Sequence, residues 1–187
     1  MSIQRQTEIM EQGQETLTGY SAVIDSDHAY IHDGIAYTAI IDLGTISAAT
    51  KIGFTTPTVA SGKYVHWRPI GLQTSADYVK FELYEGDSFT GGTAASVINR
   101  NRLSSNTTGM QNFDSGVTVT PAGTVIQHGG VGTSGNPATR SGGGGSAAEE
   151  IVLKQNTDYV VQITPDGSTD VVMELFWYEE SAGLDEA

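Results

Sequence analysis

The sequence predicts an all-β protein: an antiparallel β-sandwich with a jelly-roll-like topology and an extended N-terminal arm. Apolar and polar residues alternate strictly within 81–102 and again within 170–180, which is the pattern of half-buried strands. Turn-forming residues recur at short intervals between such stretches, and no segment of the body has a convincing helical period. Many short strands with frequent turns are typical of sandwiches and jelly rolls.

Four segments in the first half of the body alternate with period two, so each is expected to bury one face. They are Ile35–Leu43, Lys51–Thr55, Tyr64–Arg68 and Tyr78–Tyr84. Two weaker strands are expected at 95–99 and 117–127. The second of these is interrupted by a Pro-Ala-Gly step at 121–123.

The last two strands are expected to form a β-hairpin. The sequence TPDGS at 164–168 supplies the turn between them. Their inward residues are expected to be Tyr159, Val161 and Ile163 in the first strand, and Val171, Met173, Leu175 and Trp177 in the second.

Composition also sets the domain boundaries. Residues 1–34 are expected to form an arm, because their N-terminal half is rich in Gln and Glu and has too few large apolar residues to be stabilised by its own burial. Residues 35–180 form the sandwich, 129–146 a glycine-rich loop within it, and 181–187 an acidic tail. The arm is expected to be ordered by lying on a partner, through the side chains of Ile3, Ile9, Met10 and Leu17.

The composition argues against several functions. Acidic residues outnumber basic ones by 22 to 9 in the 187-residue chain, and the net charge of −13 disfavours binding to nucleic acid or to anionic membranes. The absence of cysteine excludes disulfides, thiolate metal sites and a cysteine nucleophile. Without an apolar span or a signal-peptide core, the chain is expected to be made, and to stay soluble, without a secretion signal.

No catalytic motif is present. The chain lacks a phosphate-binding loop and a GxSxG elbow. A glycosidase would need a positioned pair of carboxyl groups, and Glu82, Glu85, Asp87 and Glu174 are available. Any chain with 22 acidic residues supplies such pairs by chance, however, so we predict neither an enzymatic activity nor a cofactor.

His28 and His32 are four residues apart, the spacing at which a helix places two imidazoles on one face for a metal ion. Their neighbours Asp27, Asp33 and Gly34 lie beside a predicted strand, so a helical register is not expected. A role in a turn or in docking the arm is favoured over metal binding.

Carbohydrate binding is an alternative. Tyr64, His66, Tyr84 and Tyr178 are expected to face outward and could form a platform on which sugars stack. Aromatic residues at strand period, however, belong more often to the core or to cross-strand pairs.

Asn99, Arg100, Asn101 and Arg102 form the densest basic segment. Two arginines two positions apart on a strand would face the same side, where guanidinium groups pair with carboxylates. A salt bridge within one subunit and a contact between subunits both fit this pattern. These four residues, together with His28 and His32, complete the candidate interface.

Several motifs in this chain resemble those of small virion proteins from tailed bacteriophages. They are LYEG (Leu83–Gly86), NRNR (Asn99–Arg102) and VLKQNTDY (Val152–Tyr159), set within a similar order of segments from about Asp27 to Glu180. The resemblance implies a non-enzymatic decoration or cement protein with a β-sandwich body. Its implied partners are the major capsid protein and copies of itself in a homotrimer, on the outer surface of the virion. The alternative is a receptor- or glycan-binding module of a head or tail fibre.

Overall fold

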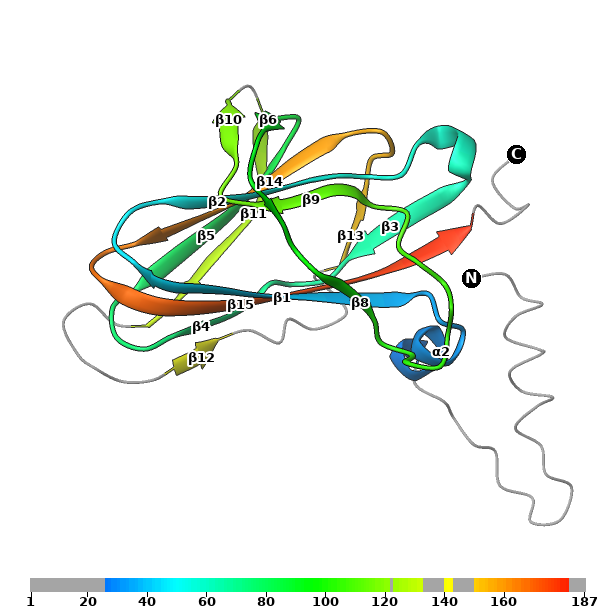
Figure 1. The fold of residues 1–187 in the computed structure, drawn as a ribbon, viewed down its shortest axis with the longest axis horizontal. Helices are drawn as coiled ribbons and strands as arrows, with labels where there is room; N and C mark the ends of the chain where they lie inside the picture. The colour runs from blue at the N-terminus through cyan, green and yellow to red at the C-terminus, as the bar shows by residue number, and fades with distance from the viewer. Residues whose placement is uncertain (1–25, 122, 133–139, 143–149, 182–187) are drawn as a thin grey trace, which may run out of the picture.

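The computed structural model describes residues 26–121, 123–132, 140–142 and 150–181, which fold into two antiparallel sheets that face each other (Figure 1). The seven-stranded sheet contains β1 (Ala36–Ile46), β3 (Lys63–Trp67), β4 (Gly71–Thr74), β8 (Val97–Asn99), β12 (Arg140–Gly142), β13 (Ile151–Leu153) and β15 (Thr169–Ser181). The six-stranded sheet contains β2 (Thr50–Thr55), β5 (Val79–Glu85), β7 (Thr93–Ala94), β9 (Gln111–Ser115), β11 (Thr124–Val131) and β14 (Asp158–Pro165).

Three smaller elements complete the fold. Strands β6 (Ser88–Thr90) and β10 (Thr118–Thr120) form a separate two-stranded ribbon, at the top of Figure 1. A 3₁₀ turn, η1 (Val59–Ser61), precedes β3. Helix α2 (Ser26–His32) leads into β1 and lies beside the seven-stranded sheet (Figure 1). Among the described residues, no helix has the length and apolar character needed to cross a membrane.

The strands pair in nested order, as in one long hairpin that has been folded over. The first strand pairs with the last, β1 with β15, and the second with the second-to-last, β2 with β14. The same rule continues inward through β3–β13, β4–β12, β5–β11, β6–β10 and β7–β9. This nesting, divided between two facing sheets, is the jelly-roll arrangement, and it confirms the predicted fold class.

The core lies between the two sheets and is centred on aromatic rings. Phe54 of the six-stranded sheet stacks on Trp67 of the seven-stranded sheet, with ring centroids 4.9 Å apart, and also lies 5.6 Å from Phe113. Phe113 in turn lies 5.6 Å from Trp177. The inward positions predicted for β14 and β15 are buried, and so is one apolar face of β2, β3 and β5, because each strand presents that face to the opposite sheet.

The predicted C-terminal hairpin is wrong. Strand β14 pairs with β2 and β5, whereas β15 pairs with β1, β3 and β4, so the turn at 164–168 carries the chain from one sheet to the other. Alternation identifies which face of a strand is buried, but two buried faces can meet across a sandwich as well as side by side in one sheet. The turn residues alone do not distinguish these two outcomes.

The predicted glycine-rich loop at 129–146 is also wrong in part. Residues 129–131 belong to β11 and 140–142 form β12, while 133–139 and 143–146 lie outside the described residues. A Cβ atom at Gly129 would lie 2.7 Å from the ring of Phe81, and one at Gly130 would lie 2.3 Å from the hydroxyl of Tyr78. These glycines are therefore strand residues that leave room for the ring of Phe81 on β5 and for the ring of Tyr78, which directly precedes β5.

Replacing Phe54 with Ala tests the aromatic core. Phe54 is fully buried, so the truncation leaves a cavity between the sheets. We expect the free energy of unfolding, measured by urea denaturation, to fall by about 3–5 kcal/mol. Val59→Ala, at a position that is 69% exposed, is the control, and its effect should stay within about 0.5 kcal/mol. Equal losses in the two variants would contradict this placement of the core.

Candidate functional site

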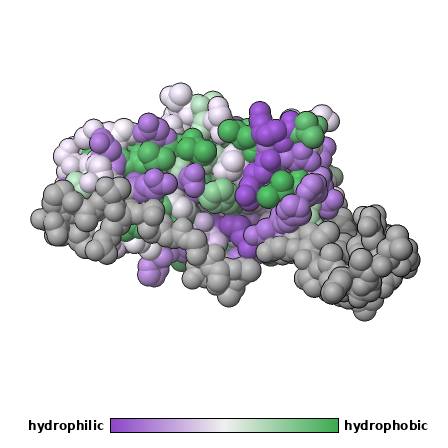
Figure 2. Space-filling model, turned by 90° about the horizontal axis from the view of Figure 1, so that it is seen from below, coloured by the Kyte–Doolittle hydropathy of each residue, from purple (hydrophilic) through white to green (hydrophobic). Residues whose placement is uncertain are grey.

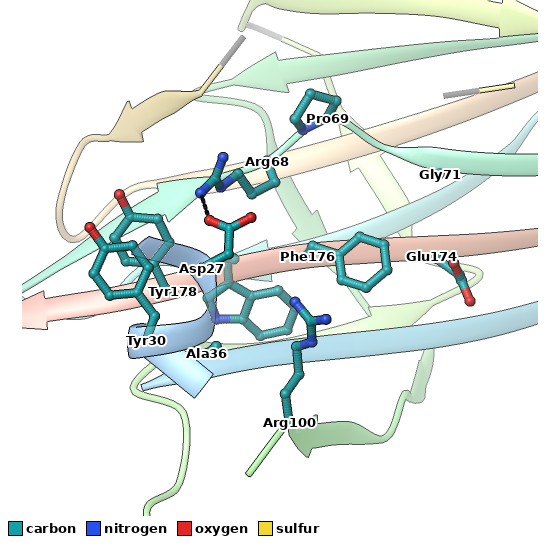
Figure 3. Close-up of a pocket in the computed structure, with 11 residues that line it drawn as sticks. Asp27, Tyr30, Ala36, Arg68, Pro69, Gly71, Arg100, Glu174, Phe176 and Tyr178 are labelled. Carbon is teal, nitrogen blue, oxygen red and sulfur yellow. Dashed lines mark hydrogen bonds and ion pairs between the residues drawn. The ribbon is translucent and has the colours of Figure 1, made fainter. Parts of the chain in front are cut away.

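A cleft of about 290 Å³ opens on the outer face of the seven-stranded sheet, next to helix α2. Its charged side chains are Asp27, Arg68, Arg100 and Glu174, and its apolar lining includes Tyr30, Ala36, Pro69, Phe176 and Tyr178. Figure 3 shows Arg68 and Arg100 approaching the cleft from opposite sides, with Phe176 next to them and Glu174 further along the same strand.

Helix α2 is held against the sheet by a stack of three rings. Tyr30 stacks on Tyr178 with centroids 4.0 Å apart, and Tyr178 stacks on His66 at 4.4 Å. Tyr30 and Tyr178 are both buried as a result, and Ala36 packs with them. The expectation that Tyr178 faces outward is correct for its position on the sheet, but the helix covers it.

The carboxylate of Glu150 connects this stack to the charged side of the cleft. One of its oxygens accepts a hydrogen bond from the Tyr178 hydroxyl at 2.7 Å and lies 2.9 Å from Nδ1 of His66. The other oxygen lies 3.2 Å from Nε of Arg68, and Arg68 also forms an ion pair with Asp27 of α2. One arginine thus ties the start of the helix to the residue that precedes β13.

Two tyrosines in this region have pKa values raised above the ordinary range. Burial is the main cause for both, and the hydrogen bond to Glu150 raises the pKa of Tyr178 further. Burial thus favours the protonated form of the Tyr178 hydroxyl, which is the form that donates to Glu150.

His28 and His32 lie within helix α2, so the expectation that they are not helical is wrong. Their rings are 4.4 Å apart, as the four-residue spacing gives on one helical face. The helix forms because Tyr30 gains burial against Tyr178, a contact that local sequence does not reveal. Among the residues that the structure describes, no group of three His, Cys, Asp or Glu side chains is arranged to hold a metal ion.

The asparagines of the NRNR segment hold the end of the helix in place. The side-chain amide of Asn99 donates to the carbonyl of Gly34 at 2.8 Å, and that of Asn101 donates to the carbonyl of His32 at 3.0 Å. These bonds satisfy carbonyls at the helix terminus that have no partner within the helix. Asn99 and Asn101 therefore act within the subunit.

The two arginines of this segment behave differently from each other. Strand β8 ends at Asn99, so the predicted strand geometry does not extend to Arg100 and Arg102. Arg100 lies over the ring of Phe176 at 5.5 Å, and Arg102 is exposed. Within the described ranges neither forms the predicted salt bridge, and a contact with another subunit stays a prediction. Ile3, Ile9, Met10 and Leu17 lie outside the described residues.

The predicted aromatic platform does not form. Tyr64 and His66 belong to β3 of the seven-stranded sheet, whereas Tyr84 belongs to β5 of the other sheet and donates a hydrogen bond to Glu82 at 3.2 Å. Tyr178 is covered by Tyr30. The four residues are therefore divided between two sheets and a buried stack.

Two of the carboxyl groups weighed for catalysis are fixed in ion pairs. A hydrogen bond from Lys80 holds the pKa of Glu82 below its usual range, and one from Lys154 does the same for Glu85. A general acid needs the opposite shift, because it must keep its proton near neutral pH. Neither residue is suited to that role.

The sequence does not single out most of the residues that build the cleft. Arg68 could be placed on an outward face, but Asp27, Glu150, Glu174 and Phe176 carry no local signal that joins them. No protein-family model matches the chain, and no curated protein matches its sequence.

The behaviour of the fold at high pH tests the buried position of Tyr37 in the core. Tyr37 donates a hydrogen bond to the carbonyl of Thr107 at 3.1 Å, and burial, together with the charge of Glu179, raises the pKa of Tyr37 to about 12. In the unfolded chain the same phenol has a pKa of about 10, so the folded protein holds this proton more tightly. Its contribution to stability is complete below that pH and is lost as the pH rises toward 12.

We therefore expect the free energy of unfolding, measured by urea denaturation, to decline above a pH of about 10. Tyr37→Phe should make that decline shallower, because the variant has no phenol to deprotonate at this position. An unchanged slope in the variant would contradict the assignment.

Proposed function

We propose that the chain is a non-enzymatic decoration or cement protein of a tailed-phage capsid, bound to the outer surface of the shell. The observation that carries this proposal is the docking of helix α2. Tyr30, the Asp27–Arg68 ion pair and the two asparagines attach the helix firmly to the sandwich. The 25 residues that precede the helix therefore start from a fixed point on a rigid body.

Such a body suits a protein that reinforces a shell. The sandwich is stabilised by its own aromatic core, so the N-terminal segment can contact neighbouring subunits without contributing to the fold. Many copies, assembled as homotrimers, each add a modest contact across the junctions between capsomers. Modest energies per contact combine into a large effect when the contacts are linked on one particle.

The visible surface below the seven-stranded sheet agrees with this role. Hydrophilic and hydrophobic residues are interspersed there, rather than gathered into one continuous apolar face (Figure 2). Ile40 of β1 and Val152 of β13 are each 53% exposed. A mixed surface of this kind is typical of proteins that fold alone and then bind a partner.

A variant that lacks residues 1–20 tests the arm. We expect its body to fold, because the described core and the α2 anchor are intact, and we expect it not to bind shells. Binding is measured by co-sedimentation with capsids that lack the protein. A full-length variant with Ser in place of Ile3, Ile9, Met10 and Leu17 should behave in the same way. Full occupancy of the shell by the truncated protein would contradict the proposal that the arm mediates binding.

The second candidate function is a receptor- or glycan-binding module of a head or tail fibre. The observation that favours it is the cleft beside α2, which combines aromatic, basic and acidic side chains in a small concave site.

The number of copies per particle separates the two functions. If the chain is a decoration protein, quantitative mass spectrometry of purified virions should give on the order of hundreds of copies, in a simple ratio to the major capsid protein. The number is high because a symmetric shell has many equivalent junctions. A dozen copies or fewer would favour the fibre module and contradict decoration.

A further inference from the structure

The cleft contains two charged groups that have no oppositely charged partner among the described residues. The Nζ atoms of Lys63, Lys80 and Lys154 each lie within 3.1 Å of a glutamate oxygen. Such pairs are expected in a chain with many more acidic than basic residues. In the described part of the chain, by contrast, the guanidinium of Arg100 and the carboxylate of Glu174 make no hydrogen bond or ion pair. Both groups line the cleft.

The ring of Phe176 stands between these groups. Glu174 and Phe176 are two positions apart on β15, so both point to the outer face of the sheet. The guanidinium of Arg100 lies 5.5 Å from the centre of the Phe176 ring. The cleft thus presents a hydrogen-bond donor, an apolar wall and a hydrogen-bond acceptor in sequence (Figure 3).

A glycine keeps the acceptor end of the cleft open. Gly71 of β4 is opposite Glu174 in the strand register, and a Cβ atom at this position would lie 3.3 Å from the Cβ of Glu174. The resulting volume of about 290 Å³ is at the lower limit for small-ligand sites and suits a single ring.

From this arrangement we infer that the cleft binds one carboxylated sugar ring, a uronic acid, either free or as a residue of a polysaccharide. Arg100 pairs with the carboxylate, the ring lies against Phe176, and Glu174 accepts hydrogen bonds from the hydroxyl groups at the other end. This inference rests on the second candidate function and names its ligand.

Other ligands satisfy the cleft less well. A simple carboxylate would pair with Arg100 but leave the Phe176 wall and Glu174 unused. A neutral sugar would donate hydrogen bonds to Glu174 but leave the guanidinium of Arg100 without an anion. The guanidinium would then not form the two parallel hydrogen bonds by which it binds a carboxylate. A ligand with a carboxylate at one end and hydroxyls at the other uses all three groups.

The test compares two sugars that differ only at C6, methyl β-glucuronide and methyl β-glucoside, titrated into the full-length protein and followed by NMR. We expect the glucuronide to bind with a Kd on the order of 1 mM and the glucoside to bind about tenfold more weakly. Arg100→Gln should remove this preference, and Arg100→Lys should restore only part of it. Glu174→Gln should weaken the binding of both sugars.

Arg102→Gln is the matched control. Arg102 is exposed, lies two residues after Arg100 and does not line the cleft, so the variant loses the same charge outside the site. Equal affinity for the two sugars, no binding of the glucuronide, or an Arg100→Gln variant that binds like the wild type would each overturn the inference. Competition by acetate as effective as that of the glucuronide would overturn it as well, since the ligand would then be a carboxylate and not a sugar. Because the titration uses purified protein without capsids, none of these results bears on shell binding.

Discussion

The nested pairing of strands is the constraint on which the rest of the structure depends. Strands β1 and β15 come from opposite ends of the described chain, yet they pair from Ala36 opposite Tyr178 to Ile46 opposite Thr169. Every other nested pair lies within this one in sequence, so the chain must close its longest loop to complete the sandwich. Fold formation is therefore governed by non-local contacts, which cost the most chain entropy.

The same central pair places the candidate site. Because β15 lies beside β1, its outward residues Phe176 and Tyr178 form the surface on which helix α2 rests. The end of β8 then brings Asn99 and Arg100 to the other side of the helix. A docked helix, a rigid attachment point for the N-terminal segment and a cleft all follow from one strand pairing. The proposed shell binding and the proposed sugar binding use different parts of this surface.

Local periodicity was enough to predict most strands and their buried faces. Val65 and Trp67, or Val171 and Met173, could be assigned inward from alternation alone, and all four are buried. The errors arose where the outcome depended on a distant residue. Helix α2 needs Tyr178, and strand β11 uses Gly129 and Gly130 because the rings of Phe81 and Tyr78 lie against them. The apparent hairpin of β14 and β15 is divided between two sheets.

The all-β class, the absence of disulfides and the acidic, sparsely charged character of the protein follow from its composition and from the two-residue period of a strand. The tertiary structure was needed to establish which strands are neighbours and which tyrosines are covered. Arg100 and Glu174 each drew attention in the sequence, but for different reasons, and nothing there connected them. They form one site because the pairing of β8, β1 and β15 brings side chains from distant parts of the chain to the same outer face.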